Sequence, residues 1–144
     1  MSLVYVDTGV LMKRYVRTPT SDAIDDLLGD EAHRFALSEI SLIEMESALA
    51  RRAREPGGKP SSLPQQRLRF ETDLRLGFFD LQPMSPAVLL MARQLIAEGK
   101  PPLATLDAIH LATALKAEAG ALATDDRQLA RAAKAQSLGV ISFL

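Results

Sequence analysis

Short apolar segments alternate with amphipathic helical segments along the chain, and this order leaves few folds open. Segments that favour strands lie at 3–6, 34–38, 78–81, 121–123 and 140–143, and each stretch between them has helical spacing. Parallel strands need long crossover connections, usually helices, so the alternation predicts an α/β fold with a largely parallel sheet. No linker is long enough to divide the 144 residues, and we expect one domain over residues 1–144.

The helical segment 104–120 carries a carboxylate on its apolar face. Asp107 lies four residues after Leu103 and four before Leu111, a spacing that places all three on one side of a helix. A buried carboxylate without a partner is costly, so a cap, a cationic side chain or a metal ion must hold it there.

The other notable acids follow the predicted strands. Asp7 comes directly after the first strand, Asp125 and Asp126 follow the fourth, and Glu44 lies in the expected first turn of the helix after the second. The helix of Asp107 leads into the fourth strand and begins at the same edge. Because sites in parallel α/β sheets form beyond the carboxyl ends of the strands, these acids are predicted to converge.

Such a group of carboxylates suits Mg²⁺ or Mn²⁺, which prefer oxygen ligands and can activate water for phosphodiester hydrolysis. The chain has no Cys and two His, which argues against thiolate or His-rich metal sites. Each acid alone also has an ordinary structural explanation. Asp7 and Asp125 are typical helix N-caps, while Glu44 and Asp126 are acids favoured by the dipole near a helix start.

Several neighbours of the acids allow two interpretations. His110, three residues after Asp107, is either a partner in the site or a half-buried helix histidine. Thr8 and Thr124 flank two of the acids and either orient a water molecule or cap a helix. Three nearby cations either contact substrate phosphates or are simply solvated: Lys13, Arg14 and Arg51.

The overall composition excludes little more. The net charge of −1 gives no general attraction to nucleic acid, although a local basic patch remains open. No apolar run approaches the roughly 18 residues of a membrane span, and the first residues do not have the pattern of a signal peptide. We therefore expect a cytoplasmic protein without a membrane partner.

Four segments in order resemble the PIN-domain family, and within it the VapC-type toxins: VYVDTGVLMKRYV, SEISLIEMESALARR, LDAIHLATAL and LATDDRQLARAAKAQSLGVI. The resemblance implies a three-layer α/β/α sandwich with about five strands. It also implies a Mg²⁺- or Mn²⁺-dependent endoribonuclease that cuts RNA. Such proteins are often homodimers, and a small VapB-type antitoxin neutralises them by covering the acidic site.

The resemblance assigns the four acids of the family to Asp7, Glu44, Asp107 and Asp126. Asp125 competes with Asp126 for the last position, because both follow Thr124. Glu46 competes only weakly with Glu44, since it lies about 200° around the helix. Gly9 departs from the family, which usually has Ser or Ala there, and its missing side chain predicts a weaker helix start.

Three other functions remain open from the sequence. A receiver-type signalling domain needs an Asp just after the third strand, whereas Asp80 falls inside that segment. A non-catalytic binding module would have little reason to keep Asp107 on an inward face. A PIN nuclease of RNA processing, outside toxin–antitoxin systems, has no feature in one chain that separates it from a toxin.

Overall fold

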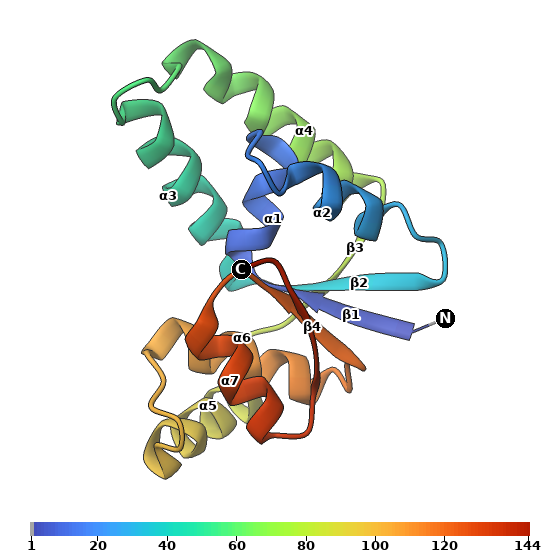
Figure 1. The fold of residues 1–144 in the computed structure, drawn as a ribbon, viewed down its shortest axis with the longest axis vertical. Coiled ribbons are helices and arrows are strands. Elements are labelled where there is room, and N and C mark those ends of the chain that lie inside the picture. The colour runs from blue at the N-terminus through green and yellow to red at the C-terminus, as the bar shows by residue number, and fades with distance from the viewer. Residues whose placement is uncertain (1) are drawn as a thin grey trace.

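The computed structural model describes residues 2–144 and contains one five-stranded sheet (Figure 1). Every pair of neighbouring strands is parallel, in the order β3-β2-β1-β4-β5. The strands are β1 (Ser2–Val6), β2 (His33–Ser38), β3 (Phe79–Gln82), β4 (Ala121–Thr124) and β5 (Gly139–Ser142). The predicted parallel α/β architecture is therefore confirmed.

Helices cover both faces of the sheet, which gives the three layers that the resemblance implied (Figure 1). One face carries α1 (Thr8–Tyr15), α2 (Ser21–Leu28), α3 (Ile40–Arg54) and α4 (Leu63–Arg75), with the short 3₁₀ helix η1 (Pro60–Ser62) between the last two. The other face carries α5 (Pro86–Glu98), α6 (Thr105–Lys116) and α7 (Arg127–Ala135). No helix in residues 2–144 is long and apolar enough to cross a membrane.

Alternate residues of the central strand enter different cores. Val4 and Val6 pack under α1 to α4, whereas Tyr5 between them packs under α5 to α7. All three side chains are buried, as the period of two in a strand requires when both faces are covered. Both layers of helices are thus fixed to β1, the strand whose end begins the acidic site.

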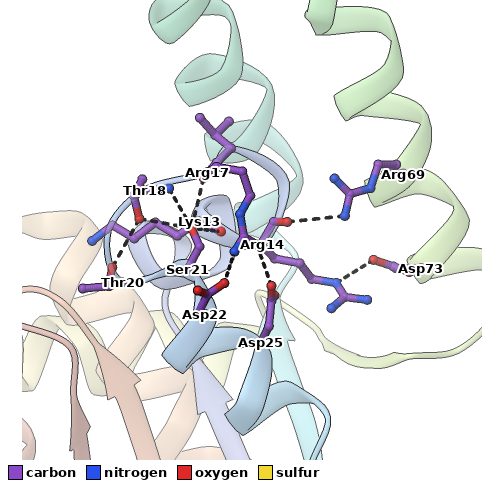
Figure 2. Close-up of polar contacts among 11 residues, drawn as sticks. Lys13, Arg14, Arg17, Thr18, Thr20, Ser21, Asp22, Asp25, Arg69 and Asp73 are labelled. Atoms are coloured by element: carbon purple, nitrogen blue, oxygen red, sulfur yellow. Dashed lines mark hydrogen bonds and ion pairs between the residues drawn. The ribbon is translucent and has the colours of Figure 1, made fainter.

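The helices α3 and α4 form a long antiparallel arm beside α1 (Figure 1). Its base is tied to α1 by Asp73 of α4, whose Oδ2 accepts a 3.0 Å hydrogen bond from Arg14 Nε (Figure 2). The same oxygen also accepts a 2.6 Å hydrogen bond from the Tyr15 hydroxyl. The ring of Phe70 packs on Tyr15 at 5.4 Å between centroids. These contacts hold the arm, which includes α3, against α1.

Candidate active site

Asp7 lies where β1 ends and α1 begins. Its Oδ1 accepts a 2.8 Å hydrogen bond from the Val10 amide and so caps α1, while Oδ2 accepts the hydroxyl of Thr124. The side chain is only 5% exposed. This burial raises the pKa of Asp7 to about 6, although the bonds from Thr124 and Val10 partly counteract it.

Thr124, at the end of β4, links Asp7 to Asp126. Its Oγ1 donates to Asp7 and accepts a 2.9 Å hydrogen bond from the Asp126 amide. Asp126 is the N-cap of α7, accepting a 3.0 Å bond from the Leu129 amide. The interpretation of Asp125 as the cap was therefore wrong, because the chain turns once more before α7 begins.

Asp107 lies in the first turn of α6, as predicted, and its side chain is half-buried. Burial raises its pKa, the negative charges of Asp126 and Glu44 raise it further, and His110 partly opposes them. Within residues 2–144, no hydrogen bond or ion pair reaches the carboxylate of Asp107. Among residues 2–144, the acid is thus held beside other acids without a hydrogen bond or ion pair to compensate its charge, and only the nearby His110 acts in its favour.

Glu44 reaches the group from α3, on the opposite side of the sheet from α6. It lies in the second turn rather than the expected first, because the helix already begins at Ile40, so the helix dipole does not explain it. Its Oε1 accepts a 2.8 Å hydrogen bond from Thr8 Oγ1 and lies 2.6 Å from His110 Nε2. Burial raises the pKa of Glu44, but the bonds from His110 and Thr8 outweigh it and leave the pKa lowered.

His110 is buried, with 3% exposure, and its short polar contacts are with Glu44 and Tyr5 rather than with Asp107, while Thr8 Oγ1 lies 3.5 Å from Nε2. The Tyr5 hydroxyl lies 2.6 Å from Nδ1. The bonds are mutually satisfied when Tyr5 donates to Nδ1 and the Nε2–H group donates to Glu44. Sequence reasoning missed Tyr5, although a hydroxyl within an otherwise aliphatic strand was an available signal.

Lys13 and Asp125 form an ion pair, with Nζ 2.7 Å from Oδ2. The carboxylate of Asp125 lies against Gly9, where a Cβ atom would be 3.0 Å from Cγ and closer still to Oδ1. Gly9, which departs from the family pattern, thus leaves the space that Asp125 fills. Asp126, and not Asp125, is the acid whose charge acts on Asp107.

The remaining predicted cations have different surroundings. Arg14 is held by Asp73 and its guanidinium group lies 4.7 Å from the ring centroid of Phe78, so its contacts lead to α4 and not to the acids. Arg51 is exposed and lines a groove of about 440 Å³ that also borders Thr8 and Glu44. Glu46 turns away from this groove and pairs with Arg67 of α4 at 2.7 Å.

The acidic side chains of the site are of the chemical type that binds a hard divalent cation. Asp7, Glu44, Asp107 and Asp126 offer carboxylate oxygens, and both oxygens of Asp107 are free of protein hydrogen bonds within the described residues. As these side chains lie, no three His, Asp or Glu groups of residues 2–144 are arranged to hold a metal by themselves. Mg²⁺ in proteins usually keeps several water ligands, which is compatible with so open an arrangement.

The fold and the site together define a class of protein: a parallel α/β/α sandwich with a group of acidic side chains at the carboxyl edge of its sheet. Residues 4–135 match the sequence profile of the family described as PIN domain. The chain belongs to the PIN domain family.

Relatives in the same family span the whole chain. Ribonuclease VapC35 of Mycobacterium tuberculosis is 33% identical over 147 residues, which cover 97% of this chain and 96% of the relative. Ribonuclease VapC46 of the same species is also 33% identical over 147 residues, covering 99% and 98%.

Solved structures agree in fold. FitAcB from Neisseria gonorrhoeae has a TM-score of 0.72 at 20% identity and covers 96% of both chains. VapC20 of M. tuberculosis, described as a Sarcin-Ricin loop cleaving toxin, has a TM-score of 0.65 at 16% identity, covering 87% of this chain and 92% of its own. The PIN-like fold that the sequence resemblance implied is confirmed.

Proposed function

We propose that this protein is a metal-dependent endoribonuclease toxin of a VapBC-type toxin–antitoxin pair. The observation that carries the proposal is Asp107, a half-buried carboxylate placed near Asp126 and Glu44 with no protein partner among the described residues. Such an arrangement costs stability unless a cation binds to it. The names of the full-length relatives, Ribonuclease VapC35 and Ribonuclease VapC46, supply the reaction.

Mg²⁺ or Mn²⁺ is the proposed cofactor, held chiefly by Asp7 and Asp107, with Glu44 and Asp126 completing the pocket. Bound there, the cation would supply the Lewis acidity that activates water and neutralises charge on the phosphate. Asp7 is oriented for this role by the amide of Val10 and the hydroxyl of Thr124, which fix both of its oxygens.

Glu44 is the acid best suited to interact with a water molecule. Thr8 and His110 hold its Oε1, and the lowered pKa keeps the side chain ionised at neutral pH. Its Oε2 has no hydrogen-bond partner within residues 2–144 and is left to accept one from water. His110 is in turn fixed by Tyr5, so Glu44 has little freedom to rotate away.

The proposed protein partner is a small VapB-type antitoxin. Structural neighbours include VapBC2 from Rickettsia felis and VapBC from Salmonella typhimurium, each solved with DNA. The groove of about 440 Å³ beside Glu44 is lined by exposed apolar side chains, including Ile43 and Leu106, and has Arg51 at its border. An antitoxin segment with apolar residues and a cation directed at the acids would fit this surface.

Homodimerisation is the second proposed assembly. The helix α5 exposes Leu89 and Ile96 around an apolar hollow of about 250 Å³ that α6 borders through Thr105 and Ile109. Exposed apolar surface of this kind is typical of contacts between subunits. Sedimentation equilibrium of the purified protein tests it, with Leu89→Asp expected to shift the population towards monomer.

The function is tested by cleavage of a mixed pool of structured RNA with Mg²⁺, with Mn²⁺ or with EDTA. We expect cutting with either metal, none with EDTA, and a loss of at least about 100-fold in Asp107→Asn and Glu44→Gln. Glu46→Gln is the matched control, because it changes an acid two residues away on the same helix that pairs with Arg67 outside the groove.

Two results would contradict the proposal. Cleavage that persists in EDTA, or in Asp107→Asn, would exclude the proposed use of the acids. If no RNA is cut, calorimetry decides: Mn²⁺ binding that is absent, or unchanged in Asp107→Asn, would leave a non-catalytic module as the better interpretation.

Growth arrest on expression, relieved by a small neighbouring gene, would separate a toxin from a nuclease of RNA processing.

A further inference from the structure

Lys13 and Asp125 form an ion pair at the margin of the acidic site, and nothing in the proposed reaction uses it. The ammonium group of Lys13 lies 2.7 Å from Asp125, with side chains that are 19% and 24% exposed. Asp125 stands between Thr124, which donates to Asp7, and Asp126, which caps α7. The pair therefore joins α1 to the turn that supplies two groups of the site.

Gly9 makes this pairing possible. A Cβ atom at residue 9 would lie 3.0 Å from both Cγ and Oδ2 of Asp125 and would overlap Oδ1. Lys13 follows Gly9 by one helical turn, so both face the β4–α7 turn from the same side of α1. The space left by the missing side chain of Gly9 is thus filled by the carboxylate of Asp125, which pairs with Lys13.

The charge of the pair is as important as its shape. Asp125 is a further carboxylate close to Asp7, and its charge is one of those acting on that acid. Lys13 cancels this charge locally. The pair as a whole has no net charge and so neither attracts nor repels a cation at the site strongly. Asp125 alone would attract the cation, and Lys13 alone would repel it.

We propose that the Lys13–Asp125 ion pair, seated on Gly9, is a positioning pair that sets how tightly the neighbouring acids hold a divalent cation. Lys13 keeps Asp125 out of the ligand set and limits the negative charge of the pocket. This inference rests on the proposed function, since it concerns the cation of the same site.

A purely mechanical clamp would behave differently. If the pair only holds α1 to the β4–α7 turn, removing either residue loosens the same contact and weakens cation binding in both cases. If the pair sets the charge of the pocket, the two single substitutions act in opposite directions. Loss of Lys13 leaves the pocket more negative, and loss of the Asp125 charge leaves it more positive.

Isothermal calorimetry with Mn²⁺ alone, at low ionic strength, distinguishes these cases. We expect Lys13→Met to bind Mn²⁺ roughly three- to tenfold more tightly than the native protein, and Asp125→Asn to bind it more weakly by a similar factor. The double variant should lie within about twofold of the native protein. Added KCl should reduce each difference, because these side chains are partly solvated.

Arg17→Met is the matched control. It also removes one cation near the end of α1, but Arg17 pairs with Asp22 and Asp25 of α2 rather than with the site (Figure 2). We expect its Mn²⁺ affinity to stay within about twofold of native, since its charge is exposed and already paired.

The role of Gly9 is tested by thermal unfolding without metal. Gly9→Ser should lower Tm, and the loss should persist in Gly9→Ser/Asp125→Asn, because Asn is as large as Asp. It should be largely recovered in Gly9→Ser/Asp125→Ala, where the space is vacated. Equal losses in both double variants would show that Asp125 does not occupy this space and would overturn the geometric basis.

The remaining outcomes separate this inference from the proposed function. Native binding of Mn²⁺ that depends on Asp107, without opposite shifts in Lys13→Met and Asp125→Asn, would overturn the inference alone. Native protein that fails to bind Mn²⁺, or binds it equally well as Asp107→Asn, would overturn both.

Discussion

Replacing Thr124 by valine removes one hydroxyl from the centre of the acidic site while keeping the shape of the side chain. Thr124 has no exposed surface. Its Oγ1 donates to the carboxylate of Asp7 and accepts the 2.9 Å hydrogen bond of the Asp126 amide. A valine methyl group can do neither, so one buried carboxylate oxygen and one N–H group both lose their partners.

The two losses are expected to add. A hydrogen bond to a charged group contributes about 1.5–3 kcal/mol, and an amide left without a partner costs about 1–3 kcal/mol. We therefore expect Thr124→Val to lower the free energy of unfolding by about 3–5 kcal/mol. Thr113→Val is the matched control: its buried hydroxyl donates only to Ile109 O, at 2.6 Å, an oxygen that already accepts a helical bond. We expect Thr113→Val to lower the free energy of unfolding by less than about 1 kcal/mol.

Urea denaturation of the metal-free proteins at pH 7.5, where Asp7 is ionised, measures both values. Because whole domains have only about 5–15 kcal/mol of stability, the Thr124 variant is expected to unfold at much lower urea with an unchanged slope. A difference between the two variants below about 1 kcal/mol would mean that water replaces the hydroxyl, and the picture of a sealed link between Asp7 and Asp126 would be refuted.

Three further predictions concern single residues. Burial raises the pKa of Asp7 from 3.8 to about 6, so its ionisation opposes folding: the stability that protonated Asp7 contributes is present below about pH 4 and lost as the pH rises through 6. Relative to Asp7→Asn, the free energy of unfolding of the metal-free native protein should fall by about 3 kcal/mol across that pH window, as measured by urea titration. If the unfolding free energies of the two proteins changed with pH in the same way, the burial argument would be contradicted. Tyr5→Phe leaves His110 Nδ1 without its hydrogen-bond partner at 2.6 Å and should lower the free energy of unfolding by about 1–2 kcal/mol, measured by thermal unfolding. An unchanged stability would mean that a water molecule replaces the Tyr5 hydroxyl. Gly99→Ala forces a methyl group onto the left-handed end of α5 (φ 62°) and should lower stability by about 1 kcal/mol, whereas an unchanged Tm would mean that the helix end relaxes.

The convergence of the acids could be predicted because it depends on topology. Asp7 follows β1 and Asp126 follows the neighbouring strand β4, so parallel pairing alone brings their backbones to one edge. Asp107 was predictable from a different signal, a charged residue on an apolar helix face. These arguments need only the order of elements and their periodicity.

Side-chain partners could not be predicted in the same way. The choice between Asp125 and Asp126 depends on one additional residue before α7, and the partner of His110 depends on how α6 rotates over the sheet. Arg14 lies one position from Lys13, yet the helix turns it towards Asp73 of α4, far away in sequence. Each residue of a helix is rotated by 100° from the one before it, so the orientation of the whole helix decides which side chains meet. A single sequence does not specify that orientation directly.

The sheet order has a consequence for when activity can arise. Among residues 2–144, Asp7 precedes every helix, whereas Asp126 follows six of the seven α-helices. The strands β1 and β4 are neighbours in the sheet but far apart in the chain. Contacts so distant in sequence form late, because closing a long loop must precede them. A chain that has not yet formed β4 and the turn after it therefore lacks one side of the acidic site. An activity that needs Asp7 and Asp126 together would therefore depend on the assembled sheet and not on any single helix or strand.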